Sequence, residues 1–350
     1  GIVSSSTRGV WGGGRTPTKV NTIDYITMAS LGDGTDFGNL TDARGYPSGF
    51  SSMTRGVFGG GYDPSGSNII DYITIASTGD AADFGDLVTT QGYGGGCSNA
   101  HGGIEVYDPR LIPVGSGRGF FCLGQTPYET TGIDLIHIST LGNATEFGDA
   151  ASSGSAAGAT SSYTRGLVGG GNPDFQNTIS SFEMQSRGNN ADFGDLQDDR
   201  DGLTAVSNST RGVWAGGYDG TRMNRIDYVT ITTAGNATDF GDLTAGRNQL
   251  AGACSSTRGV FGPGNAGCVV DTVDYITTAS TGNAIDFGDS VLARDSVGAC
   301  GSRTRAMFMG GNAPVMQDNI EYFTIASTSD TTDFGDLSAA RANPCSSSMS

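Results

Sequence analysis

One stretch of sequence recurs seven times along this chain of 350 residues. Each copy opens with an arginine, found at Arg8, Arg55, Arg118, Arg165, Arg211, Arg258 and Arg305. Each copy ends near a phenylalanine, found at Phe37, Phe84, Phe147, Phe193, Phe240, Phe287 and Phe334. Both series advance by 46 or 47 residues, apart from one step of 63 between the second and third copies. A period of this size indicates a solenoid, a propeller or an array, whose units bury their apolar faces against their neighbours.

The second copy shows how one unit is built. Short runs rich in glycine, β-branched and aromatic residues, at 57–61, 69–75 and 83–87, alternate with turn residues and lack helical periodicity. Four antiparallel strands repeated seven times predict an all-β fold, a seven-bladed β-propeller with four strands per blade. We expect one domain over 1–350, with repeats at 1–44, 45–91, 92–154, 155–200, 201–247, 248–294 and 295–341.

The first strand of each unit favours a closed ring over a solenoid. It consists largely of Ser, Gly, Ala and Cys, as in 251–256, and such small residues suit innermost strands that converge on a central channel. Both chain ends, 2–6 and 342–350, carry this type of sequence, and only one of them can occupy the innermost strand of the closing blade. We expect the other to leave the domain, as part of a longer chain or assembly.

The composition excludes some partners. The net charge is −17 and Lys19 is the one lysine, so nucleic acid and anionic membrane surfaces are poor partners. The six cysteines fall at unrelated offsets within the repeats: Cys97, Cys122, Cys254, Cys268, Cys300 and Cys345. A disulfide framework should recur with the repeat, so we interpret most of them as small buried residues.

The second copy resembles the kelch repeat, in which an arginine, a strand ending in Gly-Gly, a tyrosine and a later aromatic residue follow one another. These positions are Arg44, Gly59-Gly60, Tyr72 and Phe84, and the resemblance covers essentially the whole chain. The chain departs from it by carrying Phe in every copy, where kelch repeats usually carry Trp. The opening Thr-Arg-Gly-Val-Phe-Gly-Gly-Gly, with the later Asp-Phe-Gly-Asp-Leu, also resembles repeats in structural proteins of marine tailed phages, of the cyanophage kind. That resemblance implies a virion component.

Seven acids precede the recurring phenylalanine: Asp36, Asp83, Glu146, Asp192, Asp239, Asp286 and Asp333. They and the recurring arginines occupy turns on the same face of the predicted propeller, so each series forms a ring. Because a feature present in every unit is usually structural, we expect Arg–acid pairs that tie hairpins or blades together. The alternative is that the two rings form a charged face that binds a partner or Ca²⁺. Apart from that ion, we expect no cofactor.

The opposite face carries loops that differ between the copies. We expect ligand contacts there, from Tyr62, Asp63, Tyr128, Glu129, Phe175, Tyr218, Asp219 and Arg222. Aromatic side chains can stack on sugars while polar ones orient them, so host glycans or polar protein surfaces are the expected ligands. We place the third unit's insertion, at about 93–110 with His101 and Tyr107, on the same face. Ordinary solvated loops are the alternative.

No catalytic constellation is apparent in the sequence. The two histidines, His101 and His137, are too few for a kelch-type copper site unless both converge. We therefore expect a non-catalytic module of a virion, in a tail fibre or surface decoration, that contacts host glycan or a neighbouring virion subunit. An architectural spacer without a free ligand, a cellular kelch adaptor, and a secreted or cell-surface location are the alternatives.

Overall fold

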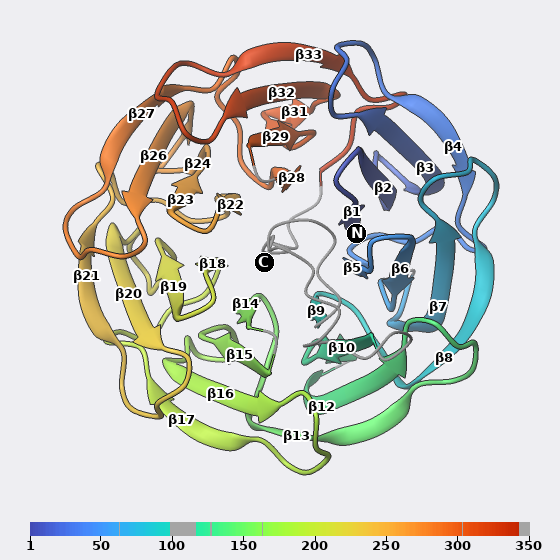
Figure 1. Ribbon diagram of the computed structural model, residues 1–350, viewed down its shortest axis with the longest axis horizontal. Helices are drawn as coiled ribbons and strands as arrows, with labels where there is room; N and C mark the ends of the chain where they lie inside the picture. The colour runs from blue at the N-terminus through green and yellow to red at the C-terminus, as the bar shows by residue number, and fades with distance from the viewer. Residues whose placement is uncertain (63, 99–116, 127, 163, 303, 343–350) are drawn as a thin grey trace.

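The computed structural model describes residues 1–62, 64–98, 117–126, 128–162, 164–302 and 304–342. These residues form seven antiparallel four-stranded sheets, arranged as the blades of a β-propeller around a central axis (Figure 1). This arrangement confirms the predicted fold class. Within each blade the strands follow chain order from the centre outward, so each blade is one continuous stretch of sequence.

The strand bounds repeat closely from blade to blade. Blades 1 and 2 consist of β1 (Ile2–Ser4), β2 (Arg8–Arg15), β3 (Lys19–Thr27), β4 (Thr35–Asn39), β5 (Ser48–Ser51), β6 (Arg55–Gly59), β7 (Ser67–Thr74) and β8 (Ala82–Gln91). Blades 3 and 4 consist of β9 (Gly95–Ser98), β10 (Arg118–Cys122), β12 (Tyr128–His137), β13 (Thr145–Gly154), β14 (Gly158–Ser161), β15 (Arg165–Gly169), β16 (Thr178–Glu183) and β17 (Ala191–Asp195).

The remaining three blades have the same plan. They consist of β18 (Thr204–Ser207), β19 (Arg211–Ala215), β20 (Arg225–Thr230), β21 (Thr238–Asp242), β22 (Gly252–Cys254), β23 (Arg258–Phe261), β26 (Thr272–Thr277), β27 (Ile285–Asp289), β28 (Gly298–Gly301), β29 (Arg305–Met309), β32 (Asn319–Thr324) and β33 (Thr332–Asp336). Short extra strands extend the loops between second and third strands: β11 (Gln125–Thr126), β24 (Gly264–Asn265), β25 (Val269–Val270), β30 (Asn312–Ala313) and β31 (Val315–Met316).

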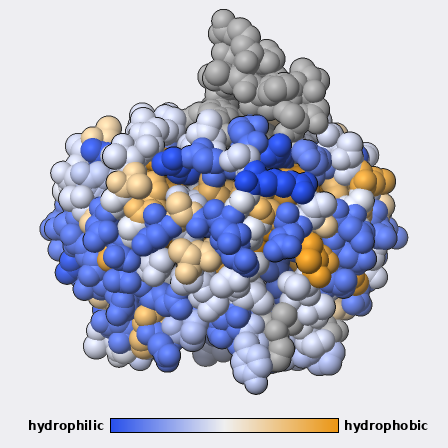
Figure 2. All heavy atoms as spheres, turned by 90° about the horizontal axis from the view of Figure 1, so that it is seen from below, coloured by the Kyte–Doolittle hydropathy of each residue, from blue (hydrophilic) through white to orange (hydrophobic). Residues whose placement is uncertain are grey.

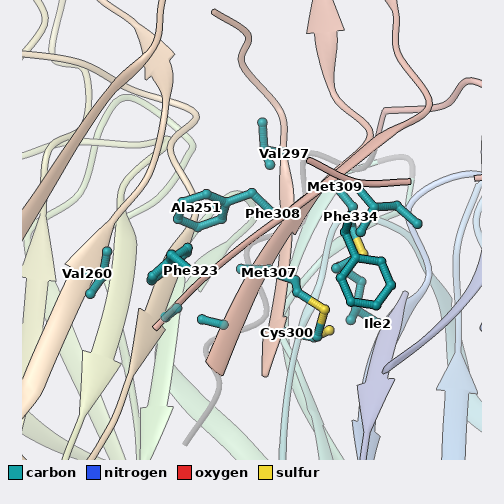
Figure 3. Close-up of a cluster of buried hydrophobic side chains, with 14 of the residues drawn as sticks. Ile2, Ala251, Val260, Val297, Cys300, Met307, Phe308, Met309, Phe323 and Phe334 are labelled. Atoms are coloured by element: carbon teal, nitrogen blue, oxygen red, sulfur yellow. The ribbon is translucent and has the colours of Figure 1, made fainter. Parts of the chain in front are cut away.

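The apolar core lies between neighbouring blades, and the innermost strands are small because they pack closely. A Cβ added to Gly49 would lie 2.6 Å from the carbonyl oxygen of Ile2, and one added to Gly298 would lie 2.3 Å from Ile2 Cδ1. One core cluster joins blades 6, 7 and 1, and Figure 3 shows Ile2 among the side chains of blade 7. Strand β1 therefore fills the innermost position of blade 1, and residues 343–350 lie outside the described residues.

Buried ion pairs between described residues join five of the seven pairs of neighbouring blades. In each, an arginine that follows the fourth strand of one blade pairs with an acid in the third strand of the next. We call these pairs clamps: Arg44–Asp71, Arg200–Asp227, Arg247–Asp274, Arg294–Glu321 and Arg341–Asp24. At 2.9 Å and with both side chains fully buried, Arg247–Asp274 is typical, and Arg247 also donates to the carbonyl oxygens of Gly262 and Phe261.

Among the described residues, blade 3 has no clamp on either side. At its junction with blade 2, the arginine position holds Gln91 and the acid position holds Asp134, and both side chains are buried. At its junction with blade 4, the arginine position holds Gly154 and the acid position holds Ser180. The aromatic ring of Phe182 fills part of that junction, with its centroid 4.9 Å from Phe120 and 5.6 Å from Phe147.

The two repeated charge series have other partners than we expected. Each opening arginine donates through Nη1 to a backbone carbonyl of the next blade, as Arg8 does to Ile75 at 2.8 Å. In five blades the guanidinium also lies 4.4–4.5 Å above a tyrosine ring of its own blade, as over Tyr25. Six of the aspartates, such as Asp36, accept a hydrogen bond from the backbone N–H two residues later, which closes their own turn. The recurring arginines and aspartates therefore bind backbone groups rather than each other, and Arg165 also pairs with Glu183, which is not one of the recurring acids.

The placement of the insertion also needs correction. Tyr93 and Gly94 precede β9, and residues 95–98 form the innermost strand of blade 3, so the start of the predicted insertion belongs to the regular blade. The strand bounds leave the extra length of this copy between β9 and β10. Residues 99–116 of that connection, with His101 and Tyr107, lie outside the described residues.

The surface is mostly hydrophilic, with isolated apolar residues, as Figure 2 shows for one side. Leu31, Leu141 and Val315 are among the exposed apolar side chains, and they belong to different blades. Among the described residues, none forms a helix that could cross a membrane.

Candidate functional site

Among the described residues, six at equivalent positions surround the central opening on the loop face. Each lies between the fourth strand of one blade and the first strand of the next, and each has a left-handed backbone. We call them the collar: Tyr46 (φ 53°), Tyr93 (φ 59°), Ala156 (φ 54°), Gly202 (φ 58°), Gln249 (φ 54°) and Ser296 (φ 55°). Five of the six are not glycine, and non-glycine residues rarely adopt this conformation outside sites that the surrounding structure holds in place.

Backbone hydrogen bonds connect the collar through blades 4 to 7. The N–H of Gly202 donates to the carbonyl of Ala156 at 3.3 Å, that of Gln249 to Gly202 at 2.8 Å, and that of Ser296 to Gln249 at 3.0 Å. Blades 2 to 7 also tie the collar segment to the segment that follows the second strand, as in the paired bonds between Asp201 and Tyr218 at 2.9 and 3.0 Å. The left-handed conformation is therefore fixed by the fold.

The collar encloses a cavity of about 500 Å³. All six collar residues line it, together with Asn172, Asp201, Tyr218, Asn248 and smaller apolar residues. This volume lies within the range of small-molecule sites. Loops that follow fourth strands and loops that follow second strands both contribute, as expected for the loop face.

An aromatic wall forms one side of the cavity. The rings of Tyr46 and Tyr93 are stacked, with centroids 4.4 Å apart and an interplanar angle of 24°. Tyr62 extends this group outward, with its ring centroid 6.1 Å from that of Tyr93, and Lys19 Nζ lies 5.1 Å above the Tyr62 ring. Tyr46 and Tyr93 lie in the segments that lead into blades 2 and 3, where Gly-Tyr follows the fourth strand of the preceding blade.

A polar wall forms another side. Asn172 Nδ2 donates to Asp201 Oδ2 at 2.5 Å. Asn248 and Gln249 also line the cavity, from the segment that leads into blade 6. Burial raises the pKa of Asp201, and the bond from Asn172 partly opposes that shift. Among the described residues that line the cavity, Asp201 is the one carboxylate, and none is Lys, Arg, His or Cys.

Of the predicted site residues, Tyr218 lines the cavity. Tyr62, Phe175 and Arg222 lie around it: Phe175 packs edge-on against Tyr218 at 5.8 Å, and Arg222 donates to Asn265 Oδ1 at 3.0 Å. Tyr128 and Glu129 belong to an outer hairpin, where Tyr128 is 79% exposed.

Two predicted residues have other surroundings. Asp219 accepts hydrogen bonds from Thr221 within its own turn, chiefly from the backbone N–H, and these lower the pKa of Asp219. Asp63 lies outside the described residues. The sequence reasoning missed the collar itself, because its side chains differ in nearly every blade; only the repeated Gly-Tyr at 45–46 and 92–93 signalled it.

The described part of the chain offers no group of three or more His, Cys, Asp or Glu side chains that could hold a metal ion. Cys97, Cys122, Cys254 and Cys300 are buried, and Cys268 is exposed. Burial raises the pKa of Cys254 to about 11.

Comparison with known proteins gives no match to a family model and none to a curated sequence. The kelch and phage resemblances therefore stay predictions from the repeats, and the fold stands on the structure.

Proposed function

We propose that this chain is a non-catalytic binding module of a phage virion, in a tail fibre or surface decoration, and that its loop face contacts host glycan or a neighbouring virion subunit. The observation that carries the proposal is the collar cavity. It combines a held, left-handed backbone with tyrosine and amide side chains that differ from blade to blade, on a scaffold that otherwise repeats. The virion setting rests on the resemblance of the repeats alone.

The side chains that line the cavity support the non-catalytic role that we propose. A carboxylate beside an amide, with tyrosines across from them, can orient a ligand through hydrogen bonds and stacking. A general acid–base pair would need a second titrating group near neutral pH, within hydrogen-bond reach of the first. Recognition is the chemistry that these residues support best.

The test is binding of the isolated chain to surface polysaccharide extracted from marine cyanobacteria, with purified virion proteins of a tailed phage as the second probe. A variant with Tyr46→Ala, Tyr93→Ala and Tyr218→Ala should lose binding while keeping its thermal unfolding temperature. Met53→Ala is the control, because Met53 is 51% exposed at a turn of the arginine face. Binding that survives the triple change, or that Met53→Ala abolishes, would place the contact surface elsewhere. Binding to neither probe would favour an architectural spacer.

A further inference from the structure

We propose that the collar cavity is a site for an uncharged, hydroxyl-rich sugar ring, stacked on the Tyr46–Tyr93 wall and hydrogen-bonded by Asp201 and its neighbouring amides. This inference rests on the proposed function and names the class of ligand for the same site. Strands β5 and β9, which follow the two tyrosines, lie across the centre from β18 and β22, which follow the polar residues (Figure 1). The cavity therefore has an aromatic side and a polar side that face each other.

The charges around the cavity argue against an anionic ligand. The lining carries the Asp201 carboxylate and no cationic side chain among the described residues, within a chain of net charge −17. An acidic sugar would bring a second negative charge beside the Asp201 carboxylate, and like charges at short range repel; the cations Lys19 and Arg222 lie at the rim and not among the lining residues.

A cationic ligand is also disfavoured, because the protein's own cations already occupy tyrosine faces at the rim. Lys19 lies over Tyr62 at 5.1 Å, and the Arg222 guanidinium lies 5.8 Å from the centre of the Tyr218 ring. A ligand ammonium near these rings would meet Lys19 and Arg222. An uncharged ligand avoids both conflicts.

The two walls match the two kinds of surface on a sugar ring. A pyranose presents an apolar C–H face, which packs on flat aromatic rings, and a rim of hydroxyl groups, which donate to carboxylate and amide oxygens. Tyr46 and Tyr93 provide a pair of nearly parallel rings on a fixed backbone. Because these side chains are held in place before the ligand arrives, little ordering is needed on binding.

The experiment is calorimetric titration of the intact chain with neutral gluco-, galacto- and manno-oligosaccharides and with uronic acid oligomers of the same length. Tyr93→Ala should weaken binding of the preferred neutral sugar at least about tenfold, a typical effect of removing a central aromatic contact. Alanine suits the backbone there, because Ala156 has the same conformation at the equivalent position of blade 4 (φ 54°). Tyr128→Ala is the matched control: Tyr128 is 79% exposed on an outer hairpin and should change affinity less than about twofold.

The outcomes separate this inference from the proposed function. Preferential binding of the uronic acid oligomers, or equal losses for Tyr93→Ala and Tyr128→Ala, would overturn the inference. Binding of the chain to virion proteins or crude polysaccharide, with no affinity for any neutral oligosaccharide, would overturn the inference and leave the proposed function standing. No binding to any probe would overturn both.

Discussion

Asp134 is a buried acid at a clamp position where Gln91 stands in place of the arginine. Its Oδ2 accepts a hydrogen bond from the N–H of Val88 at 2.9 Å, and burial, with some repulsion from Glu146, raises the pKa of Asp134. The folded chain therefore holds this proton more tightly than the unfolded chain does. At neutral pH the ionised carboxylate opposes folding, and the opposition disappears as the pH falls through the raised pKa.

Asp134→Asn should therefore increase the free energy of unfolding at pH 7, and this gain should shrink as the pH is lowered. Asp274→Asn is the matched comparison, because it leaves Arg247 buried and unpaired, which should cost about 3–5 kcal/mol. Urea unfolding of both variants between pH 4 and 8 measures the two effects. A loss for Asp134→Asn as large as that for Asp274→Asn would mean that Asp134 has a cationic partner after all.

At the scale of the blade, the clamps predict uneven local stability. Blade 6 is joined to both neighbours by clamps, through Arg247–Asp274 and Arg294–Glu321, whereas blade 3 has none on either side. Apolar packing remains at both junctions of blade 3, including the contacts of Phe182, but the described residues form no clamp there. Local opening should therefore begin at blade 3.

Hydrogen exchange under native conditions tests this expectation. Amides of β10 and β12 should show protection factors about tenfold or more below those of β23 and β26, corresponding to about 1.4 kcal/mol in opening free energy. Arg247→Gln should then lower protection in β26, since it removes one of that blade's clamps. Uniform protection of blades 3 and 6 in the unmodified chain would show that the clamps do not set local stability.

The elements also show which parts of the structure the sequence could predict. Strands such as 69–75 were identifiable because β-branched and aromatic residues recur at a fixed offset, and each repeat has its own turns. The clamp positions could have been predicted. Gly154 replaces the arginine in the third copy, and Ser180 replaces the acid in the fourth copy. Such paired changes between neighbouring repeats indicate contact. The collar could not have been predicted, because the left-handed backbone at Ala156, Gln249 and Ser296 follows from the turn between blades and not from the side chains.

At the scale of the whole molecule, the described residues close the ring without a blade built from both ends of the chain. Blade 1 consists of β1–β4 and blade 7 of β28, β29, β32 and β33, so each is continuous in sequence. Closure depends on the same contacts as the other junctions: the Arg341–Asp24 clamp, the bond from Arg305 to the carbonyl of Met28, and the packing of Ile2. The junction between blades 7 and 1 is therefore built like the other four junctions that carry a clamp.

Arg341→Gln and Arg247→Gln should then destabilise the protein to a similar extent, about 3–5 kcal/mol each, because each leaves one buried acid without its partner. Glutamine is a suitable replacement, since Gln91 occupies the same position at the junction of blades 2 and 3. Chemical unfolding gives the two losses, and the double variant should show their sum, because the two clamps share no partner. A much larger loss for Arg341→Gln, accompanied by an expanded ring in small-angle scattering, would show that this clamp alone holds the circle closed. Equal losses would mean that the clamp between blades 7 and 1 stabilises the ring to the same extent as the clamp between blades 5 and 6. Closing the ring would then need no stronger contact than the other clamped junctions have.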